Sequence, residues 1–313
     1  MAVAVVVVLG VWMVSSTNTE TAKPPPAAPR VVANVQIANA LGFSARFAYG
    51  SVWLTDSDTG QILRVDPRTR RVTARVPAGG EVTMDVAAGS VWAGRFANVG
   101  APLLRIDGRT GRVVARIPLR TPAGRSFQGG FVLAAPSRVW VIGNEAIAID
   151  PVSNRVVSQI RLGGDFKVVD AFVSNGELWL TRADDSVTRF DAVTGRRLGR
   201  ATWRAKGFMF PYADKLVSVG SGRASLVDPQ TGRALWTTRI PAQEEHDATI
   251  AGGRLLLQGT GAGGREQMWA LDPRTGRMVG RTAIPGFSVL RTLPVGRDVW
   301  TITAGGKVVI VSP

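Results

Sequence analysis

The feature that most constrains this chain is an internal repeat of about 40 residues. One copy reads GSVWLTDSDTGQILRVDPRTRRVTARV from Gly50, and the next begins GSVWAGRFANVG at Gly89. Each copy carries an aromatic or aliphatic anchor. The anchors recur at intervals of 38 to 48 residues, at Trp53, Trp92, Trp140, Trp179, Val217, Leu256 and Trp300. Seven anchors predict seven structural units.

The units contain only β signals. SVWLT and RVWVI are rich in β-branched and aromatic residues, and QILRVD alternates apolar with polar residues. No helical periodicity is evident after residue 30. A period near 40 then corresponds to four short strands, which is one propeller blade. The chain is predicted to be an all-β, seven-bladed β-propeller with four antiparallel strands per blade.

A second landmark is an aspartate that opens a hairpin in six units, at Asp66, Asp107, Asp150, Asp191, Asp228 and Asp272. In DPRTGR (272–277) proline favours the first corner, and glycine supplies the positive φ that the last position needs. Asn154 and Arg70 stand at that last position in two units. Repetition in every hairpin favours turn formation over catalysis for these aspartates.

The seventh unit stops after its third strand, KVVIV, with Ser312-Pro313 where other units have Asp-Pro. Residues 30–37, RVVANVQI, read like the fourth strands RVVARIPL and RVVSQIRL. We expect this N-terminal strand to complete the last blade and close the ring, which removes an open sheet edge. Deleting residues 30–40 is predicted to unfold the seventh blade.

The N-terminal region differs from the repeats. Residues 2–14 form an apolar run, too short for a membrane span of about 20 residues and suited to a signal peptide. We assign 1–16 to a hydrophobic signal peptide or membrane anchor, 17–29 to a Pro-rich tether, and 30–313 to the propeller domain. An extracytoplasmic location follows. No basic residue precedes the run. Two alternatives therefore stay open: a longer anchor whose upstream sequence is lost, or the outer part of a larger receptor.

The string from Gly50 to Val76, with VW, VDPRT and RVTARV, resembles the bacterial YncE-like or YVTN-type seven-bladed propellers. Virginiamycin B lyase-like propellers share this style of blade, and the resemblance covers residues 30–313. Those lyases use a magnesium site with two histidines and a glutamate. This chain has one histidine, His246, after Glu244 and Glu245, so the resemblance does not carry the lyase site over.

The repeats also resemble those of quinoprotein-type propellers. Residues 228–236, DPQTGRALW, fit that repeat from the aspartate onward, and residues 270–276, ALDPRTG, fit its first half. Gly280 stands where the second copy needs tryptophan. The resemblance implies that such tryptophans dock neighbouring blades. Quinoproteins usually have eight blades, and many hold the quinone on a vicinal disulfide. Seven units and no cysteine therefore predict no cofactor.

A ligand site is expected at one mouth of the central channel, on the strand that precedes each anchor. Arg46 and Asp85 lie seven residues before Trp53 and Trp92. With a two-residue slip, comparable places in other units hold the rest of the predicted site, which is Asp170, His246 with Asp247, and Arg291. These side chains suit a small polar ligand or a cation. Alternatively they neutralise one another around trapped water.

The net charge is +15, carried mainly by arginine. Eleven arginines fall in the aspartate hairpins against six aspartates: Arg68, Arg70, Arg71, Arg109, Arg112, Arg155, Arg196, Arg197, Arg233, Arg274 and Arg277. This surplus suits an anionic membrane surface or cell-wall polymer as partner. The alternatives are that these arginines are solvated turn residues and that the overall charge reflects codon bias. No recognition helix or basic-aromatic run is present, so nucleic acid is not expected.

Other chemistry has weak support. The D-x-D-x-G at residues 56–60 faintly resembles a calcium loop, but hairpins use the same residues. No nucleophile–base pair, phosphate loop or metal-spaced histidine set is recognisable, so no catalytic or metal-binding residue is predicted. The leading hypothesis is a monomeric, non-enzymatic propeller that binds a small polar ligand or a protein as sensor or scaffold. The alternative is a lyase or hydrolase that uses a metal and acidic residues at the channel mouth.

Overall fold

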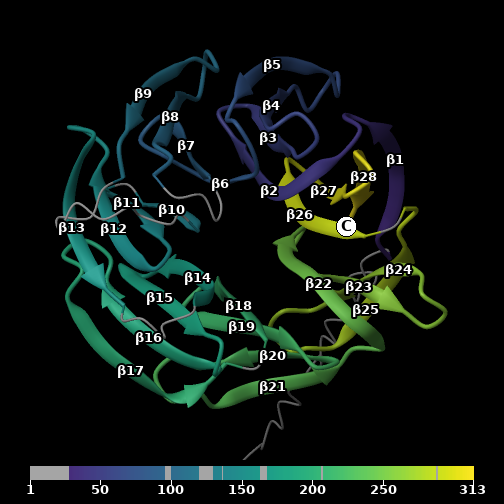
Figure 1. The fold of residues 1–313 in the computed structure, drawn as a ribbon. Coiled ribbons are helices and arrows are strands. Elements are labelled where there is room, and N and C mark those ends of the chain that lie inside the picture. The colour runs from purple at the N-terminus through teal and green to yellow at the C-terminus, as the bar shows by residue number, and fades with distance from the viewer. Residues whose placement is uncertain are drawn as a thin grey trace, which may run out of the picture.

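The computed structural model describes residues 28–95, 100–119, 130–135, 137–162, 168–205, 207–286 and 288–313. Within these residues the chain forms seven sheets of four strands each and no helix. The sheets stand around a central axis as the blades of a propeller (Figure 1). The prediction of an all-β, seven-bladed β-propeller is confirmed.

The predicted signal peptide or anchor (1–16) and the tether as far as residue 27 lie outside the described residues. In the part of the chain that the structure describes, no helix has the length and apolar character needed to cross a bilayer.

The strands occupy four positions from the channel outward. The first strands are innermost: β2 (Leu41–Ala48), β6 (Val82–Ala87), β10 (Phe131–Ala135), β14 (Val168–Ser174), β18 (Phe208–Tyr212), β22 (Ala242–Ala251) and β26 (Val289–Val295). The second strands are β3 (Ser51–Asp56), β7 (Ser90–Arg95), β11 (Arg138–Ile142), β15 (Glu177–Arg182), β19 (Lys215–Gly220), β23 (Arg254–Gly261) and β27 (Asp298–Thr303).

The third strands are β4 (Gln61–Val65), β8 (Leu103–Asp107), β12 (Glu145–Asp150), β16 (Ser186–Asp191), β20 (Arg223–Val227), β24 (Glu266–Leu271) and β28 (Lys307–Ser312). The fourth strands are outermost: β5 (Val72–Pro77), β9 (Val113–Ile117), β13 (Arg155–Arg161), β17 (Arg197–Arg204), β21 (Ala234–Arg239), β25 (Met278–Ala283) and β1 (Arg30–Gln36). Blades are numbered one to seven from β2 to β26 by their first strands.

Each predicted anchor lies on a second strand and is buried, as a strand between two apolar blade faces requires. The core is divided into seven clusters, one between each pair of neighbouring blades. The cluster between blades seven and one, for example, joins Leu54 and Leu63 to Trp300 and Ile310. The ring is therefore held by blade-to-blade packing.

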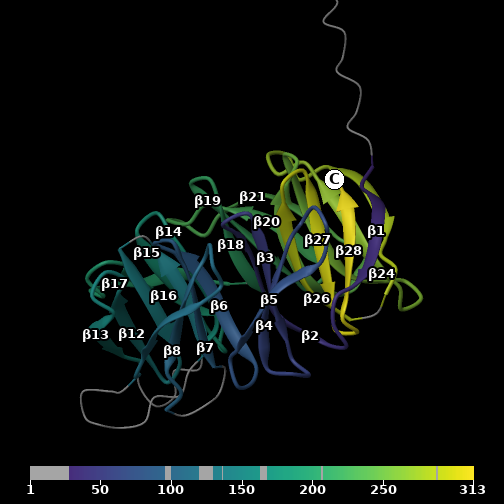
Figure 2. The ribbon, with the colours of Figure 1, turned by 90° about the horizontal axis from the view of Figure 1, so that it is seen from above.

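The N-terminal strand closes the ring. β1 pairs antiparallel with β28, from Arg30 opposite Ser312 to Gln36 opposite Lys307, and the sheet order is β1-β28-β27-β26. Figure 2 shows β1 beside β28, starting at the end of the blade where the C-terminus lies. The predicted closure by residues 30–37 is confirmed, with the strand ending one residue earlier at Gln36.

Two fourth-strand tryptophans dock on the next blade, as the quinoprotein-like repeat implies. Trp236 Nε1 donates a hydrogen bond to the Pro273 carbonyl oxygen at 3.0 Å, and Trp203 Nε1 donates to Pro229 at 3.3 Å. A Cβ atom on Gly276 would lie only 2.6 Å from the Trp236 ring, so this hairpin position needs glycine for packing as well as for its φ of 72°.

Gly280 stands where the repeat of blade six would place the next tryptophan. A Cβ atom there would meet Pro29 Cδ at 2.9 Å and Ala28 at 3.1 Å. Blade seven has no hairpin for a tryptophan to dock on, because its fourth strand is β1. Glycine at position 280 therefore leaves room for the chain that leads into β1.

Candidate functional site

Each hairpin between a third and a fourth strand is capped by its own aspartate. Asp66 Oδ1 accepts hydrogen bonds from the backbone N–H of Arg68 at 2.7 Å and Thr69 at 3.0 Å. The same two bonds form in the hairpins that begin at Asp107, Asp150, Asp191, Asp228 and Asp272. Arg70 and Asn154 take the left-handed φ that glycine takes in the other hairpins, 60° and 57°. The interpretation of these aspartates as turn formers is confirmed.

The capping bonds also keep the hairpin aspartates charged. The backbone N–H groups of the turn lower the pKa of Asp66, Asp107, Asp150, Asp191 and Asp228, because they stabilise the carboxylate. The end of the ring that carries these six hairpins, at residues 66–71, 107–112, 150–155, 191–196, 228–233 and 272–277, is called the hairpin face below. Links between second and third strands form the opposite face.

The D-x-D-x-G segment on the opposite face is a turn of the same kind. Asp56 Oδ1 accepts hydrogen bonds from the backbone N–H of Asp58 at 3.1 Å and Thr59 at 3.2 Å. These bonds occupy the oxygen that a calcium loop would direct at the ion. Among the residues that the structure describes, no group of three or more His, Asp or Glu side chains is arranged to hold a metal ion.

The predicted channel residues all lie on first strands. They are Arg46 on β2, Asp85 on β6, Asp170 on β14, His246 and Asp247 on β22, and Arg291 on β26. Arg46 and Asp85 lie directly opposite Trp53 and Trp92. The remaining carboxylates and Arg291 lie two residues deeper, opposite Thr181, Gln258 and Ile302. Since alternate residues of a strand are about 7 Å apart, the predicted site residues form two layers.

A β-bulge precedes each charged residue of the deeper layer. The strand pairing shifts between Val168 and Asp170, between Glu245 and Asp247, and between Val289 and Arg291. His246 is the extra, unpaired residue in β22. A bulge bends a strand and redirects the side chain after it, so the local backbone turns these residues toward the neighbouring blade.

The deeper carboxylates join neighbouring blades. Asp170 Oδ2 accepts a hydrogen bond from the backbone N–H of Met209 in blade five at 3.0 Å. Asp247 Oδ2 accepts one from Thr292 in blade seven at 2.5 Å, and Asp247 Oδ1 lies 3.7 Å from Arg291 Nη1. One oxygen of each carboxylate is thus committed to the next blade.

Two uncharged residues of this layer were missed in the sequence. Ser44 Oγ accepts a hydrogen bond from the backbone N–H of Met84 at 2.9 Å, and Thr83 Oγ1 donates to the Gly130 carbonyl oxygen at 2.5 Å. The first bond links β2 to β6, and the second links β6 to the residue that precedes β10 in the next blade. The available signal was an offset: Ser44, Thr83, Asp170, Asp247 and Arg291 all stand nine residues before their anchors.

The other layer connects blades one, two and three. Arg46 Nε donates to Asp85 Oδ1 at 2.7 Å, and Asp85 Oδ2 accepts a hydrogen bond from the backbone N–H of Ala134 at 2.8 Å. The Arg46 and Asp85 side chains are 23% and 21% exposed. Both oxygens of Asp85 are therefore engaged across blade boundaries, and this pair is better satisfied than Asp247 with Arg291.

The deeper layer forms one electrostatic unit across the channel. Burial raises the pKa of Asp170, and the backbone N–H groups of Met209 and Ala171 oppose that rise. The charge of Arg291 also lowers this pKa, while the charge of Asp247 raises it. Because the Arg291 side chain is 43% exposed and only loosely paired, it is the group in this layer best placed to meet a polar ligand.

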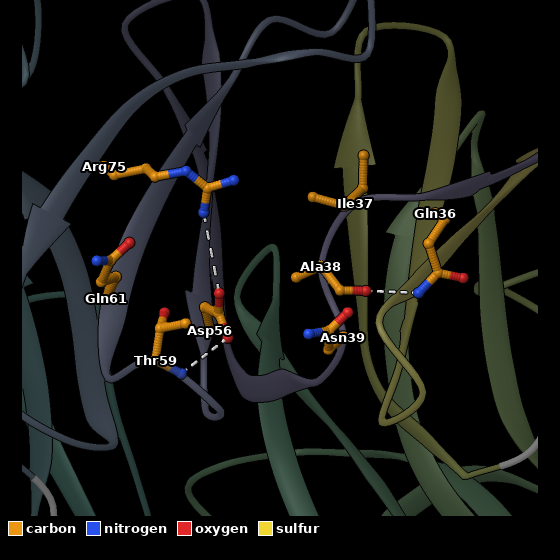
Figure 3. A pocket seen from close by; sticks show the side chains of 8 residues that line it. All are labelled: Gln36, Ile37, Ala38, Asn39, Asp56, Thr59, Gln61 and Arg75. Carbon is orange, nitrogen blue, oxygen red and sulfur yellow. Dashed lines mark hydrogen bonds and ion pairs between the residues drawn. The ribbon is translucent and has the colours of Figure 1, made fainter.

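A second hollow lies on the opposite face, at the closure seam. Its cavity of about 550 Å³ is bounded by Gln36, Ile37, Ala38, Asn39, Asp56, Thr59, Gln61 and Arg75 (Figure 3). Gln36 Nε2 donates to Ala38 O at 2.5 Å and to Gly305 O at 3.0 Å, and Arg75 Nη1 lies 4.0 Å from Asp56 Oδ2. The Gln36 bonds fasten the turn from β1 into β2, and the Arg75–Asp56 contact joins β5 to β3 within blade one.

Comparison with solved structures gives the same fold. The crystal structure of BamB from Moraxella catarrhalis is 12% identical, with a TM-score of 0.60 over 91% of this chain and 100% of that chain. The crystal structure of the computationally designed Ika8 protein is 12% identical, with a TM-score of 0.63 over 89% of this chain and 98% of that chain. At such identities the likeness concerns the fold alone. No curated protein matches the sequence.

A family comparison adds evidence from the sequence. The family model PQQ_2, described as outer membrane protein assembly factor BamB, matches residues 100–206 and 183–313. The two matches together cover more than half of the chain, with blades three to six and the three strands β26, β27 and β28 of blade seven. They include both tryptophan docks and the Asp170 and Asp247 links described above. The chain therefore belongs to the PQQ_2 family of outer membrane protein assembly factor BamB.

Proposed function

We propose that this protein is an exported, membrane-tethered propeller that serves as a non-enzymatic scaffold for binding other proteins. The family description names an outer membrane protein assembly factor, which is a role in binding and assembly. The apolar residues 2–14 and the Pro-rich segment before β1 support export and tethering. The finer likeness to YncE-like propellers, drawn from residues 50–76, is part of this proposal.

The observation that carries the non-enzymatic proposal is the use of the channel carboxylates. Asp85, Asp170 and Asp247 each accept a backbone hydrogen bond from the following blade. A general acid or base must be free to exchange a proton with substrate. Carboxylates that hold the ring together are poor candidates for that task, and their arrangement is explained by structure alone.

The location is tested by fractionating native cells and adding protease to intact cells, to cells with a permeabilised envelope, and to lysed cells. The proposal expects the protein in the membrane fraction. Protease should digest it in cells whose outer envelope has been permeabilised while the inner membrane is still sealed. Digestion only after complete lysis, or recovery in the soluble cytoplasmic fraction, would overturn the location.

The scaffold role is tested with a photo-crosslinking residue at Ser57, which is exposed on the opposite face, and at Val32, which is exposed on the outer strand β1. A binding surface on the opposite face predicts a discrete adduct from Ser57 in intact cells and none from Val32. Equal patterns at the two positions, or no adduct at either, would contradict a scaffold that uses this face.

The enzyme alternative is tested by metal analysis of the purified protein. The scaffold proposal expects no stoichiometric divalent metal. A bound metal that disappears in the Asp85→Ala/Asp247→Ala double variant, while circular dichroism shows the variant folded, would favour a metal-dependent lyase or hydrolase instead.

A second candidate function is binding of a small polar ligand by the predicted channel residues Arg46, Asp85, Asp170, His246, Asp247 and Arg291. It is favoured by the Arg291 side chain, which is 43% exposed and only loosely paired with Asp247 at 3.7 Å. Inorganic phosphate as probe should raise the melting temperature of the parent and not of Arg291→Gln. Arg297→Gln, in the exposed first turn of the same blade, is the matched control. An equal response in all three proteins would exclude this site.

A further inference from the structure

The hairpin face concentrates exposed positive charge. All eleven hairpin arginines are exposed, and the side chain of Arg274 is 83% accessible to solvent. The six hairpin aspartates point back into their own turns, where backbone N–H groups hold them. The outward-pointing charge of this face is therefore mainly positive.

The positive charge is uneven around the ring. The tip residue, two positions after each aspartate, is Arg68, Arg109 and Arg274 in blades one, two and six. In blades three and four it is a valine: Val152 is 88% exposed and Val193 is 44% exposed. Charged tips thus flank blade seven, and apolar tips lie on the far side of the ring.

Blade seven is where the chain enters the propeller. Arg30 begins β1 on the hairpin face, opposite Ser312, and Ala28 and Pro29 pack against Gly280 next to the hairpin of blade six. The described chain therefore begins at the hairpin face, between the hairpins of blades six and one, whose tips are both arginines. An anchor at the N-terminus would hold this face, and not the opposite one, toward the membrane.

We infer that the hairpin face is a docking surface for an anionic lipid bilayer. Arginine tips bind lipid phosphates in a bidentate manner, and exposed valines suit the interface between headgroups and acyl chains. A tether supplies a high local concentration of membrane, so that weak contacts suffice. This inference rests on the proposed tethered location for its setting, and it leaves the opposite face available to protein partners.

The inference is tested by sedimentation of the full-length protein with phosphatidylcholine vesicles, with and without phosphatidylglycerol. The test variant carries Arg→Gln at Arg68, Arg109, Arg274 and Arg277. The matched control carries Arg→Gln at four exposed outer-strand residues, Arg116, Arg161, Arg239 and Arg281. Both variants lose the same charge and keep the same N-terminal segment, so only the position of the charge differs.

The parent should prefer the anionic vesicles, and the hairpin variant should lose about ten-fold or more of that preference, since each arginine near such a surface contributes roughly five-fold. The outer-strand variant should keep most of the preference. Equal losses in both variants would show that vesicle binding depends on net charge alone, and this would overturn the docking surface. Binding to immobilised teichoic acid without a preference for anionic vesicles would assign the arginines to a cell-wall polymer instead.

Orientation is tested separately, because the chain has no cysteine and accepts a single labelled one. A dye at Thr69→Cys, on the hairpin face, should be quenched by a headgroup-attached quencher several times more than a dye at Ser57→Cys, on the opposite face. Equal quenching would overturn the inference even if vesicles bind. Neither assay depends on cell fractionation, so failure of the proposed location and failure of this surface give different results.

Discussion

At the scale of single residues, the hairpins show how strongly one backbone conformation is specified. Arg70 has a φ of 60°, where Gly111, Gly195, Gly232 and Gly276 have 70° to 73°. A non-glycine residue in this region is strained by contact between its Cβ and the backbone. The strain is tolerated because Asp66 and the flanking strands determine the turn.

Replacing Arg70 with glycine should therefore stabilise the protein. We expect a gain of about 0.5–1 kcal/mol, because relief of strain exceeds the extra entropy of glycine in the unfolded chain. Arg68→Gly, at the exposed tip of the same hairpin, is the control and should lower stability by a similar amount. Denaturant midpoints measure both, and a lower midpoint for Arg70→Gly than for the parent would refute the argument.

The hairpin aspartates should make the protein sensitive to acid. In Asp107 and Asp191, for example, the pKa is lower in the folded chain than in the unfolded chain, so the stability that these carboxylates contribute is present above about pH 4 and is lost as the pH falls below it. Asp107→Asn/Asp191→Asn keeps an oxygen for each turn and removes the titration. Its melting temperature should fall less between pH 6 and pH 3 than that of the parent. Asp58→Asn/Asp185→Asn removes two carboxylates outside these hairpins and is the control for the change in net charge.

At the scale of elements, β1 is the strand whose place in the fold is predicted most clearly by its sequence. Ala33 packs against the cluster between blades seven and one, and Asn34 beside it is exposed. The alternation along RVVANVQ was readable without a structure, and so was the missing fourth strand of the last unit. Closure was therefore predictable from pattern alone.

Ala33→Asp should destabilise the seventh blade by about 2 kcal/mol or more, because a carboxylate would replace a methyl group against an apolar cluster. Asn34→Asp introduces the same charge one residue away and should change stability by less than about 0.5 kcal/mol. Thermal unfolding followed by circular dichroism compares them. Equal effects would mean that β1 stabilises the blade through its backbone hydrogen bonds alone. Deleting residues 30–40, which is predicted to unfold the seventh blade, would then measure that contribution.

The channel layers were only partly predictable, because the charged residues occupy two different positions on the first strands. Counting seven residues back from Trp53 and Trp92 found Arg46 and Asp85, which lie directly opposite these anchors. Asp170, Asp247 and Arg291 lie two residues further along regularly paired stretches of their strands, and the bulges come only beyond them. Sequence reasoning searched for charge and so passed over Ser44 and Thr83. Bonds from a side chain to the backbone of the next blade have no sequence signature of their own.

At the scale of the whole molecule, the seven interfaces between blades are unequal. The cluster between blades four and five, with Phe172, Trp179 and Met209, is the smallest in the described part of the chain. A cavity of about 550 Å³ follows the same interface, lined in part by Ser225 and Thr237. Regions with few buried apolar contacts open at low cost in free energy.

Hydrogen exchange should therefore be fastest along this interface. We expect the amides of β17 and β18 to exchange before those of β3 and β27, which adjoin the larger cluster between blades one and seven. Exchange followed by mass spectrometry at peptide resolution measures the order. Faster exchange at β27 and β28 would show that the closing blade, and not the interface between blades four and five, is the weakest point of the ring.

The pairing of β1 with β28 also fixes an order of events during synthesis. Among the described strands, the first to be made has its partner in the last, so the ring stays open until β28 has been synthesised. Until then β1 and the exposed edge of the seventh blade are both available to other chains. A ring closed in this way reaches its folded form only once β28 has been made and can pair with β1.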